Sequence, residues 1–133
     1  MNKLHATLES YEVEGELCRL VLDADGQKFY TLLLDIDAFG NFTTGDSFSL
    51  LFKESEVFVA TKESCVSASN SFVSLIKHIK HGKILSEITF DFFGSEIVAL
   101  ITYHSAVRLK LEVDKDFLWF VKANEITLQK GEM

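Results

Sequence analysis

The chain of 133 residues contains one sequence pattern twice. The segment "LFKESEVFV" at 51–59 recurs as "FVKANEITL" at 120–128, with lysine, glutamate and aliphatic residues in the same places. Earlier positions match at a constant offset, as Asp23 with Asp91 and Gly26 with Gly94. Such self-similarity indicates two copies of one structural unit. Because a unit of about 65 residues buries little surface, we expect the copies to pack on each other or on other subunits.

Two domains follow from this repeat. We place the first at residues 1–62 and the second at 67–130, with the linker within the small, polar segment "TKESCVSAS". Apolar and polar residues alternate along both repeats, and proline is absent. This period-two pattern predicts β-strands, and Asp25–Gly26 predicts a hairpin turn.

Five strands are expected in each repeat. They are "KLHATLESYEV", "LCRLVLDA", "KFYTLLLDI", "SFSLLFK" and "EVFVA" in the first, and "SFVSLIKHI", "LSEITFDF", "SEIVALITY", "DFLWFVK" and "EITLQ" in the second. A short helix is predicted between the third and fourth strands, with Asp37 and Ser105 as N-caps. The fold class is therefore all-β, with two tandem OB-like barrels of five strands.

Charge and composition exclude several classes of protein. The net charge is −7, and residues 1–64 hold 5 Lys/Arg against 12 Asp/Glu, whereas residues 65–133 hold 8 of each. This balance argues against a nucleic-acid partner. No apolar run approaches the roughly 18 to 20 residues of a membrane span, and no signal peptide is recognisable, so we expect a cytoplasmic protein without membrane contact. Cys18 and Cys65 lack metal-site spacing and indicate packed thiols.

No catalytic motif is present. The sequence contains no P-loop, HExxH, nucleophile elbow or paired catalytic carboxylates, so we do not expect an enzyme. The segment "KHIKHGK" around His78 and His81 is compatible with a metal or anion site, but a solvated hairpin tip explains it better. Trp119 fits a core or an oligomer interface better than a platform for stacking nucleic-acid bases, since basic residues do not alternate with the aromatic ones.

One group of residues suits an anion. Ser105 at a helix start, Thr102 before it and Lys122 on the next strand would offer two hydroxyls, backbone N–H groups and a positive charge. Each of these three residues also has an ordinary structural interpretation. A serine commonly caps a helix, a threonine commonly packs in a strand, and a lysine is commonly solvated. The residues alone leave both interpretations open.

The second repeat resembles the Mop domain of molbindins, also called the TOBE domain. The resemblance rests on "SASNSFVSLI", "EITFDFFGSEIVALITYHSAVRLKL" and "FVKANEITL", where the family shows Ser-Ala-Arg-Asn, Ile-Thr-x-x-Ser and Lys-Ala-x-Glu-Val. A weaker version covers the first repeat through "MNKLHATLESYE" and "LLFKESEVFVA". Two such repeats resemble the di-Mop molbindins, which bind molybdate or tungstate for storage or homeostasis.

The resemblance implies a cytoplasmic homo-oligomer, commonly a trimer, with molybdate transport or cofactor-synthesis proteins as partners. In this family the oxyanion sites lie at interfaces, and each site is formed by two groups of residues, or shells, that come from different repeats. Carried over by position, one shell contains Ser67, Ser69 and Asn70, the other contains Thr102, Ser105, Lys122 and Ala123, and the first-repeat equivalents are Asn2 and Lys53.

Three positions depart from the family pattern. Ser69 replaces the family's arginine, and Leu34 and Asp37 stand where threonine and serine are expected. At an effective dielectric of about 20, a carboxylate about 4 Å from an anion costs on the order of 4 kcal/mol, or roughly three decades of affinity. These departures motivate an alternative, a non-catalytic TOBE-type module that regulates a molybdate transporter or regulator and binds oxyanions weakly or not at all.

Overall fold

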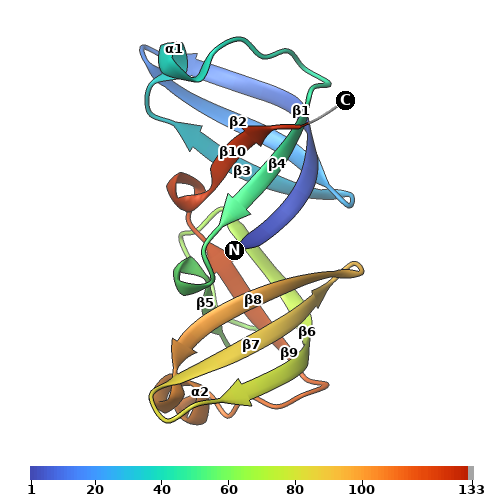
Figure 1. The fold of residues 1–133 in the computed structure, drawn as a ribbon, viewed down its shortest axis with the longest axis vertical. Coiled ribbons are helices and arrows are strands. Elements are labelled where there is room, and N and C mark those ends of the chain that lie inside the picture. The colour runs from blue at the N-terminus through green and yellow to red at the C-terminus, as the bar shows by residue number, and fades with distance from the viewer. Residues whose placement is uncertain (132–133) are drawn as a thin grey trace. The chain divides into compact units, whose positions relative to one another are not determined.

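The computed structural model describes residues 1–131, which form two compact units. The Trp119 unit comprises Met1–Asn2 and Lys53–Val121, and the Cys18 unit comprises Lys3–Phe52 and the described residues from Lys122 onward. Each unit is built around one five-stranded sheet that curls on itself (Figure 1). This confirms the predicted fold class of two five-stranded, all-β units.

The elements follow the predicted order in both repeats. The first repeat contains β1 (Asn2–Glu14), β2 (Leu17–Ala24), β3 (Gln27–Leu33), α1 (Ile36–Phe39), β4 (Ser47–Phe52), the 3-10 turn η1 (Glu54–Glu56) and β5 (Phe58–Ala60). The second contains β6 (Asn70–His81), β7 (Leu85–Phe92), β8 (Ser95–Thr102), α2 (Tyr103–Arg108), β9 (Asp116–Val121), the 3-10 turn η2 (Ala123–Glu125) and β10 (Thr127–Lys130).

The last strands of the two repeats are exchanged. One sheet has the order β10-β4-β1-β2-β3 and the other β5-β9-β6-β7-β8, so each sheet takes one edge strand from the other repeat. In Figure 1, β10 in red runs beside β4 in green. The compact units therefore do not contain the same residue ranges as the sequence repeats at 1–62 and 67–130. Either last strand satisfies the alternating pattern, which is why the sequence does not reveal the exchange.

Alternation along the strands produces two separate cores. On β1, Leu4, Ala6 and Leu8 are buried while the residues between them are exposed, as expected for a strand with one covered face. The Trp119 unit has an aromatic centre, in which the fully buried Trp119 lies 5.1 Å from the Phe72 ring, centre to centre. The indole Nε1–H of Trp119 donates to Ser74 Oγ at 2.9 Å, so this buried polar group is paired.

A charge-reversed ion pair marks equivalent places in the two sheets. The register shifts at Glu9 in β1 and at Lys77 in β6. Glu9 pairs with Lys28 of β3, whereas Lys77 pairs with Glu96 of β8 at 3.0 Å. If β3 and β8 changed places, like charges would meet at both positions, and this disfavours the wrong pairing of strands.

The helices start earlier than the sequence predicts. Thr102, with extended backbone angles (φ −70°, ψ 147°), is the N-cap of α2, and its Oγ1 accepts from the Ser105 backbone N–H. In α1, Asp35 is the cap and accepts from the Ala38 N–H. The assignment of Ser105 and Asp37 as caps is therefore wrong, because a suitable oxygen acceptor already stands where each strand ends. Within residues 1–131, neither helix is long and apolar enough to cross a membrane.

Candidate functional site

The structure divides the predicted oxyanion residues between the two units. The Trp119 unit contains Asn2, Lys53, Ser67, Ser69, Asn70, Thr102 and Ser105, and the Cys18 unit contains Lys122 and Ala123. The strand exchange causes this division, since the chain enters the Cys18 unit after β9. The predicted combination of Thr102 and Ser105 with Lys122 is thus not formed within either unit.

Thr102 and Ser105 are brought together at the end of β8. Thr102 Oγ1 accepts from the Ser105 backbone N–H at 3.1 Å, and the Thr102 hydroxyl donates to Ser105 Oγ at 2.9 Å. Two hydroxyls are thereby held in one fixed arrangement at the junction of a strand and a short helix. Neither depends on a long flexible side chain for its position.

These hydroxyls line a cavity of about 490 Å³ within the Trp119 unit. The wall combines aliphatic residues and Phe58 with six hydrogen-bonding side chains. The polar members are Ser55, Thr61, Ser64, Thr102, Ser105 and Arg108. No carboxylate lines the cavity, although the chain carries 20 acidic residues. An anion placed there would meet hydroxyl donors and one cation, without a facing negative charge.

Lys53 is the lysine that the structure brings close to this cavity. It precedes η1, and η1 packs against β8. Lys53 lines a neighbouring cavity of about 350 Å³, and both cavities share Ser55 and Leu100 in their walls. Lys53 is exposed and forms no ion pair among the described residues. The second cavity also contains Glu54 and Glu87, so its charge is mixed.

The other predicted residues lie outside the Thr102–Ser105 cavity. Asn2 is 4% exposed, and its side-chain amide pairs with the backbone of Val98, donating to the carbonyl and accepting from the N–H at 2.8 Å each. Asn70 is fully buried at the start of β6. Ser67 and Ser69 are exposed in the loop between β5 and β6. The two asparagines thus occupy structural positions, whereas the two serines are available to solvent.

Arg108 is the cavity residue that sequence reasoning missed. It ends α2, and one of its terminal nitrogens donates to Ser105 Oγ at 3.4 Å. The spacing of three residues from Ser105 places both on one face of a helix, which is a signal available in the sequence. It was not used because a charged residue on a short helix is ordinarily solvated.

The surroundings of α1 in the Cys18 unit have a different character. A cavity of about 280 Å³ next to α1 is lined by Tyr11, Ile36, Asp37, Gly40, Asn41 and Phe42. It contains the Asp37 carboxylate and no serine or threonine. Leu34, at the position of Thr102, is 71% exposed. The turn η2, which Lys122 precedes, packs against β3 of this unit.

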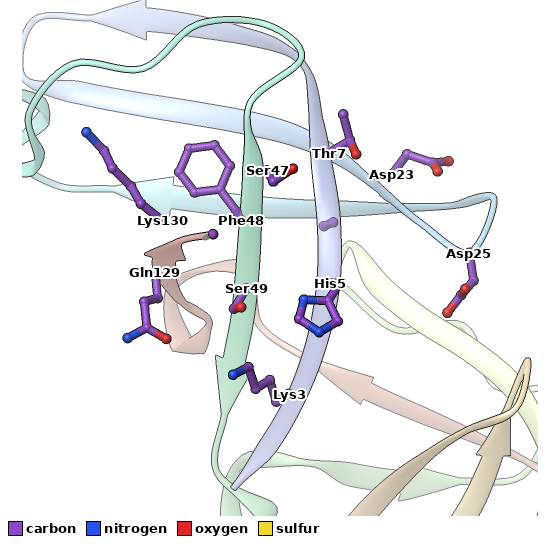
Figure 2. Close-up of a pocket in the computed structure, with 12 residues that line it drawn as sticks. Lys3, His5, Thr7, Asp23, Asp25, Ser47, Phe48, Ser49, Gln129 and Lys130 are labelled. Atoms are coloured by element: carbon purple, nitrogen blue, oxygen red, sulfur yellow. The ribbon is translucent and has the colours of Figure 1, made fainter. Parts of the chain in front are cut away.

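A larger groove of about 660 Å³ crosses the sheet of the Cys18 unit. Figure 2 shows its labelled side chains spread over β1, β2, β4, β10 and the turn after β2, with Lys130 and Asp25 far apart at opposite ends. Lys130 is engaged with the Asn41 carbonyl. Opposite charges that do not converge give no oxyanion receptor. Across residues 1–131, no cluster of three or more His, Cys, Asp or Glu residues could hold a metal ion.

Comparison with known proteins adds evidence on the fold. No protein-family model matches the chain, and no curated protein matches it. Among solved structures, it is similar to the cytoplasmic molybdate-binding protein ModG in a crystal form with molybdate bound. The two share 18% sequence identity with a TM-score of 0.90, over 98% of this chain and 96% of that chain. The resemblance to molybdate-binding proteins found in the sequence is thus confirmed at the level of the fold.

Proposed function

We propose that this protein is a cytoplasmic, non-catalytic oxyanion-binding protein of the Mop type, which binds molybdate or tungstate for storage or homeostasis. The observation that carries the proposal is the cavity of the Trp119 unit, where five hydroxyl side chains and Arg108 face one space without a carboxylate. The likeness of the fold to molybdate-binding ModG supports the same conclusion.

The chemistry of the cavity suits a tetrahedral dianion. Each oxygen of such an anion accepts hydrogen bonds, and hydroxyl groups can donate without introducing a competing negative charge. Hydrogen bonds to a charged group are shorter and stronger than neutral ones. Lys53, which lines the adjoining cavity, adds a positive charge. Ser105 and Lys53 are therefore the proposed donors within one chain, and Thr102, which donates its hydroxyl proton to Ser105, is proposed to hold Ser105 in place.

Further ligands would come from another copy of the chain. Ser67 and Ser69 are exposed and do not line the cavity, so in a homo-oligomer they are free to reach the cavity of a neighbouring subunit. We propose a trimer on the strength of the family resemblance. Asn70 then fixes the start of β6 from which this loop extends, and Asn2 has the corresponding structural role on β1.

One functional site per chain is expected. In the Cys18 unit, Lys122 precedes η2 and Ala123 begins it, but α1 has Asp37 at the position of Ser105. By the same Coulomb argument, a carboxylate near the anion costs on the order of 4 kcal/mol. The proposed binding at Lys122 is accordingly weaker than at Lys53 by a wide margin.

The matched pair Lys53→Ala and Lys122→Ala tests this assignment. We would measure bound molybdenum per chain by equilibrium dialysis, with millimolar sulfate present. Loss of one hydrogen bond to a charged group weakens binding by about ten- to a hundred-fold, so Lys53→Ala should lose affinity while Lys122→Ala retains it. The reverse result would reassign the site to the Cys18 unit. If the folded wild-type chain took up no molybdenum or tungsten, the regulatory module without oxyanion binding would be the better account.

A further inference from the structure

We propose that Arg108 is a direct oxyanion ligand and sets the preference of the site for a dianion over a monoanion. This inference rests on the proposed function, and it concerns a residue that the sequence resemblance does not place in the site. Its basis is the hydrogen bonding of Ser105 and the charge distribution of the cavity.

The proton of the Ser105 hydroxyl is not used in a hydrogen bond. Its Oγ accepts from the Thr102 hydroxyl at 2.9 Å and from the Arg108 guanidinium at 3.4 Å. A serine hydroxyl has two acceptor lone pairs and one proton, so both lone pairs are used and the proton remains to be donated. Among the described residues, this hydroxyl donates no hydrogen bond. The arrangement therefore presents an O–H donor beside a guanidinium, and both favour an external anion.

Arg108 is the one charged side chain in the lining of this cavity. It forms no ion pair with the described residues, whereas the other arginine, Arg19, pairs with Glu12 at 3.1 Å. A guanidinium is planar and offers several N–H donors in a fixed fork, which matches two oxygens of an oxyanion. Since one N–H contacts Ser105 weakly at 3.4 Å, Arg108 can turn its stronger contacts toward a bound anion.

This placement makes a charge-dependent prediction. Coulomb attraction between Arg108 and the ligand doubles when the ligand charge goes from −1 to −2. Molybdate and perrhenate are both tetrahedral oxyanions, but molybdate carries two negative charges and perrhenate one. If Arg108 contacts the anion, its loss should weaken molybdate binding more than perrhenate binding. A residue that only shapes the cavity would affect the two anions equally.

The test compares Arg108→Gln, Arg108→Lys and the control Lys110→Gln by calorimetric titration of the full chain with molybdate and with perrhenate. Lys110 lies close by in the sequence and does not line the cavity, so its replacement removes the same charge without the contact. We expect Arg108→Gln to weaken molybdate binding by about ten- to a hundred-fold, and perrhenate binding by a smaller factor. Arg108→Lys should fall between it and the wild type, and Lys110→Gln should stay within about twofold.

The outcomes separate this inference from the proposed function. Wild-type affinity in Arg108→Gln would overturn the inference and leave the proposed function intact, as would equal losses for the two anions. Absence of binding in the wild type would contradict both. Thermal unfolding of each variant verifies the fold. If Arg108→Gln did not fold, Arg108→Lys would decide, and unchanged molybdate affinity in that variant would overturn the role of the guanidinium.

Discussion

The two units have the same topology but differ at the place where an anion would bind. The Trp119 unit has Thr102, Ser105 and Arg108, and the Cys18 unit has Leu34, Asp37 and a glycine at the corresponding positions. Both nonetheless form a five-stranded sheet with a capped helix after the third strand of the repeat. The comparison teaches that the fold and the site are specified by different residues, so that one can be lost while the other is kept.

The first repeat contributes residues to the proposed site in the other unit. Through the strand exchange it supplies Lys53, Ser55 and Thr61 to the Trp119 unit. A change that removed β5 would therefore damage the remaining cavity directly. This gives a physical reason for two repeats in one chain even where the first has a carboxylate in place of the expected serine.

Each unit has its own spectroscopic or chemical reporter. Trp119 is the only tryptophan of the chain, and it is fully buried in its unit. Cys18 is fully buried in the other unit, and burial raises the pKa of its thiol, so it should react with thiol reagents only after that unit opens. Cys65 is exposed, so the expectation of a packed thiol is wrong for it, and it should react at once. Fluorescence and thiol labelling can thus follow the two units separately.

The largest expected effect comes from making the Trp119 unit resemble its counterpart. Ser105→Asp places a carboxylate in the proposed anion site, and two like charges about 4 Å apart cost on the order of 4 kcal/mol. Molybdate affinity in equilibrium dialysis should fall by about three decades. The control Asp37→Ser alters the equivalent position and should leave the affinity of the first site unchanged. Binding that survived Ser105→Asp would mean that the anion lies elsewhere.

The converse change should create a weak second site. Leu34→Thr combined with Asp37→Ser restores the two hydroxyls and removes the carboxylate in the Cys18 unit. We expect a second molybdate per chain, bound at least about tenfold more weakly than the first because no guanidinium is present. Gly40, at the position of Arg108, has φ of +97° and would be strained by an arginine. A stoichiometry that stayed at one in calorimetry would show that more than these residues separates the units.

A smaller effect is expected from the hydrogen bond in the aromatic core. Ser74→Ala leaves the buried Trp119 Nε1–H without its acceptor and should lower the free energy of unfolding of that unit by about 1–3 kcal/mol. The equivalent residues of the Cys18 unit, Ala6 and Leu50, are both apolar, so no polar group there needs a partner. Urea unfolding followed by Trp119 fluorescence measures the change, and Cys18 labelling should shift less. Equal shifts of both reporters would show that the units unfold together.

The smallest expected effect is a gain of stability in the Cys18 unit. Thr31 is fully buried, and its hydroxyl has no hydrogen-bond partner among the described residues, whereas Ala99 occupies the equivalent position in the other unit. Thr31→Val removes this unpaired group at nearly constant volume and should raise the free energy of unfolding by about 1 kcal/mol. The urea midpoint for Cys18 labelling is the measurement. A lowered midpoint would reveal a hydrogen bond that Thr31 makes in solution.

Most of the fold could be predicted from the sequence, because alternation of apolar and polar residues fixes strands and the repeat fixes their number. β2 and β7 match the predicted segments residue for residue. The helix caps were misplaced, because Thr102 and Ser105 are both acceptable caps and only the backbone angles decide between them.

The composition of the site was less predictable. A single sequence does not say whether a repeat keeps its last strand, and the exchange places Lys53, and not Lys122, in the unit that contains Thr102. Arg108 resembles an ordinary solvated residue of a short helix, and the proposed role depends also on the absence of acidic neighbours in the cavity wall, which the sequence does not show. The strand exchange and the lining of the cavity depend on packing between distant parts of the chain, whereas the strands depend on the local alternation of apolar and polar residues.

Amide chemical-shift mapping by NMR during a molybdate titration tests the central claim most directly. We predict saturable shifts at Thr102–Arg108 and around Lys53–Ser55, complete at one anion per chain, with residues 34–40 unaffected. Shifts centred on residues 34–40 and Lys122, or no shifts at saturating molybdate, would contradict the account.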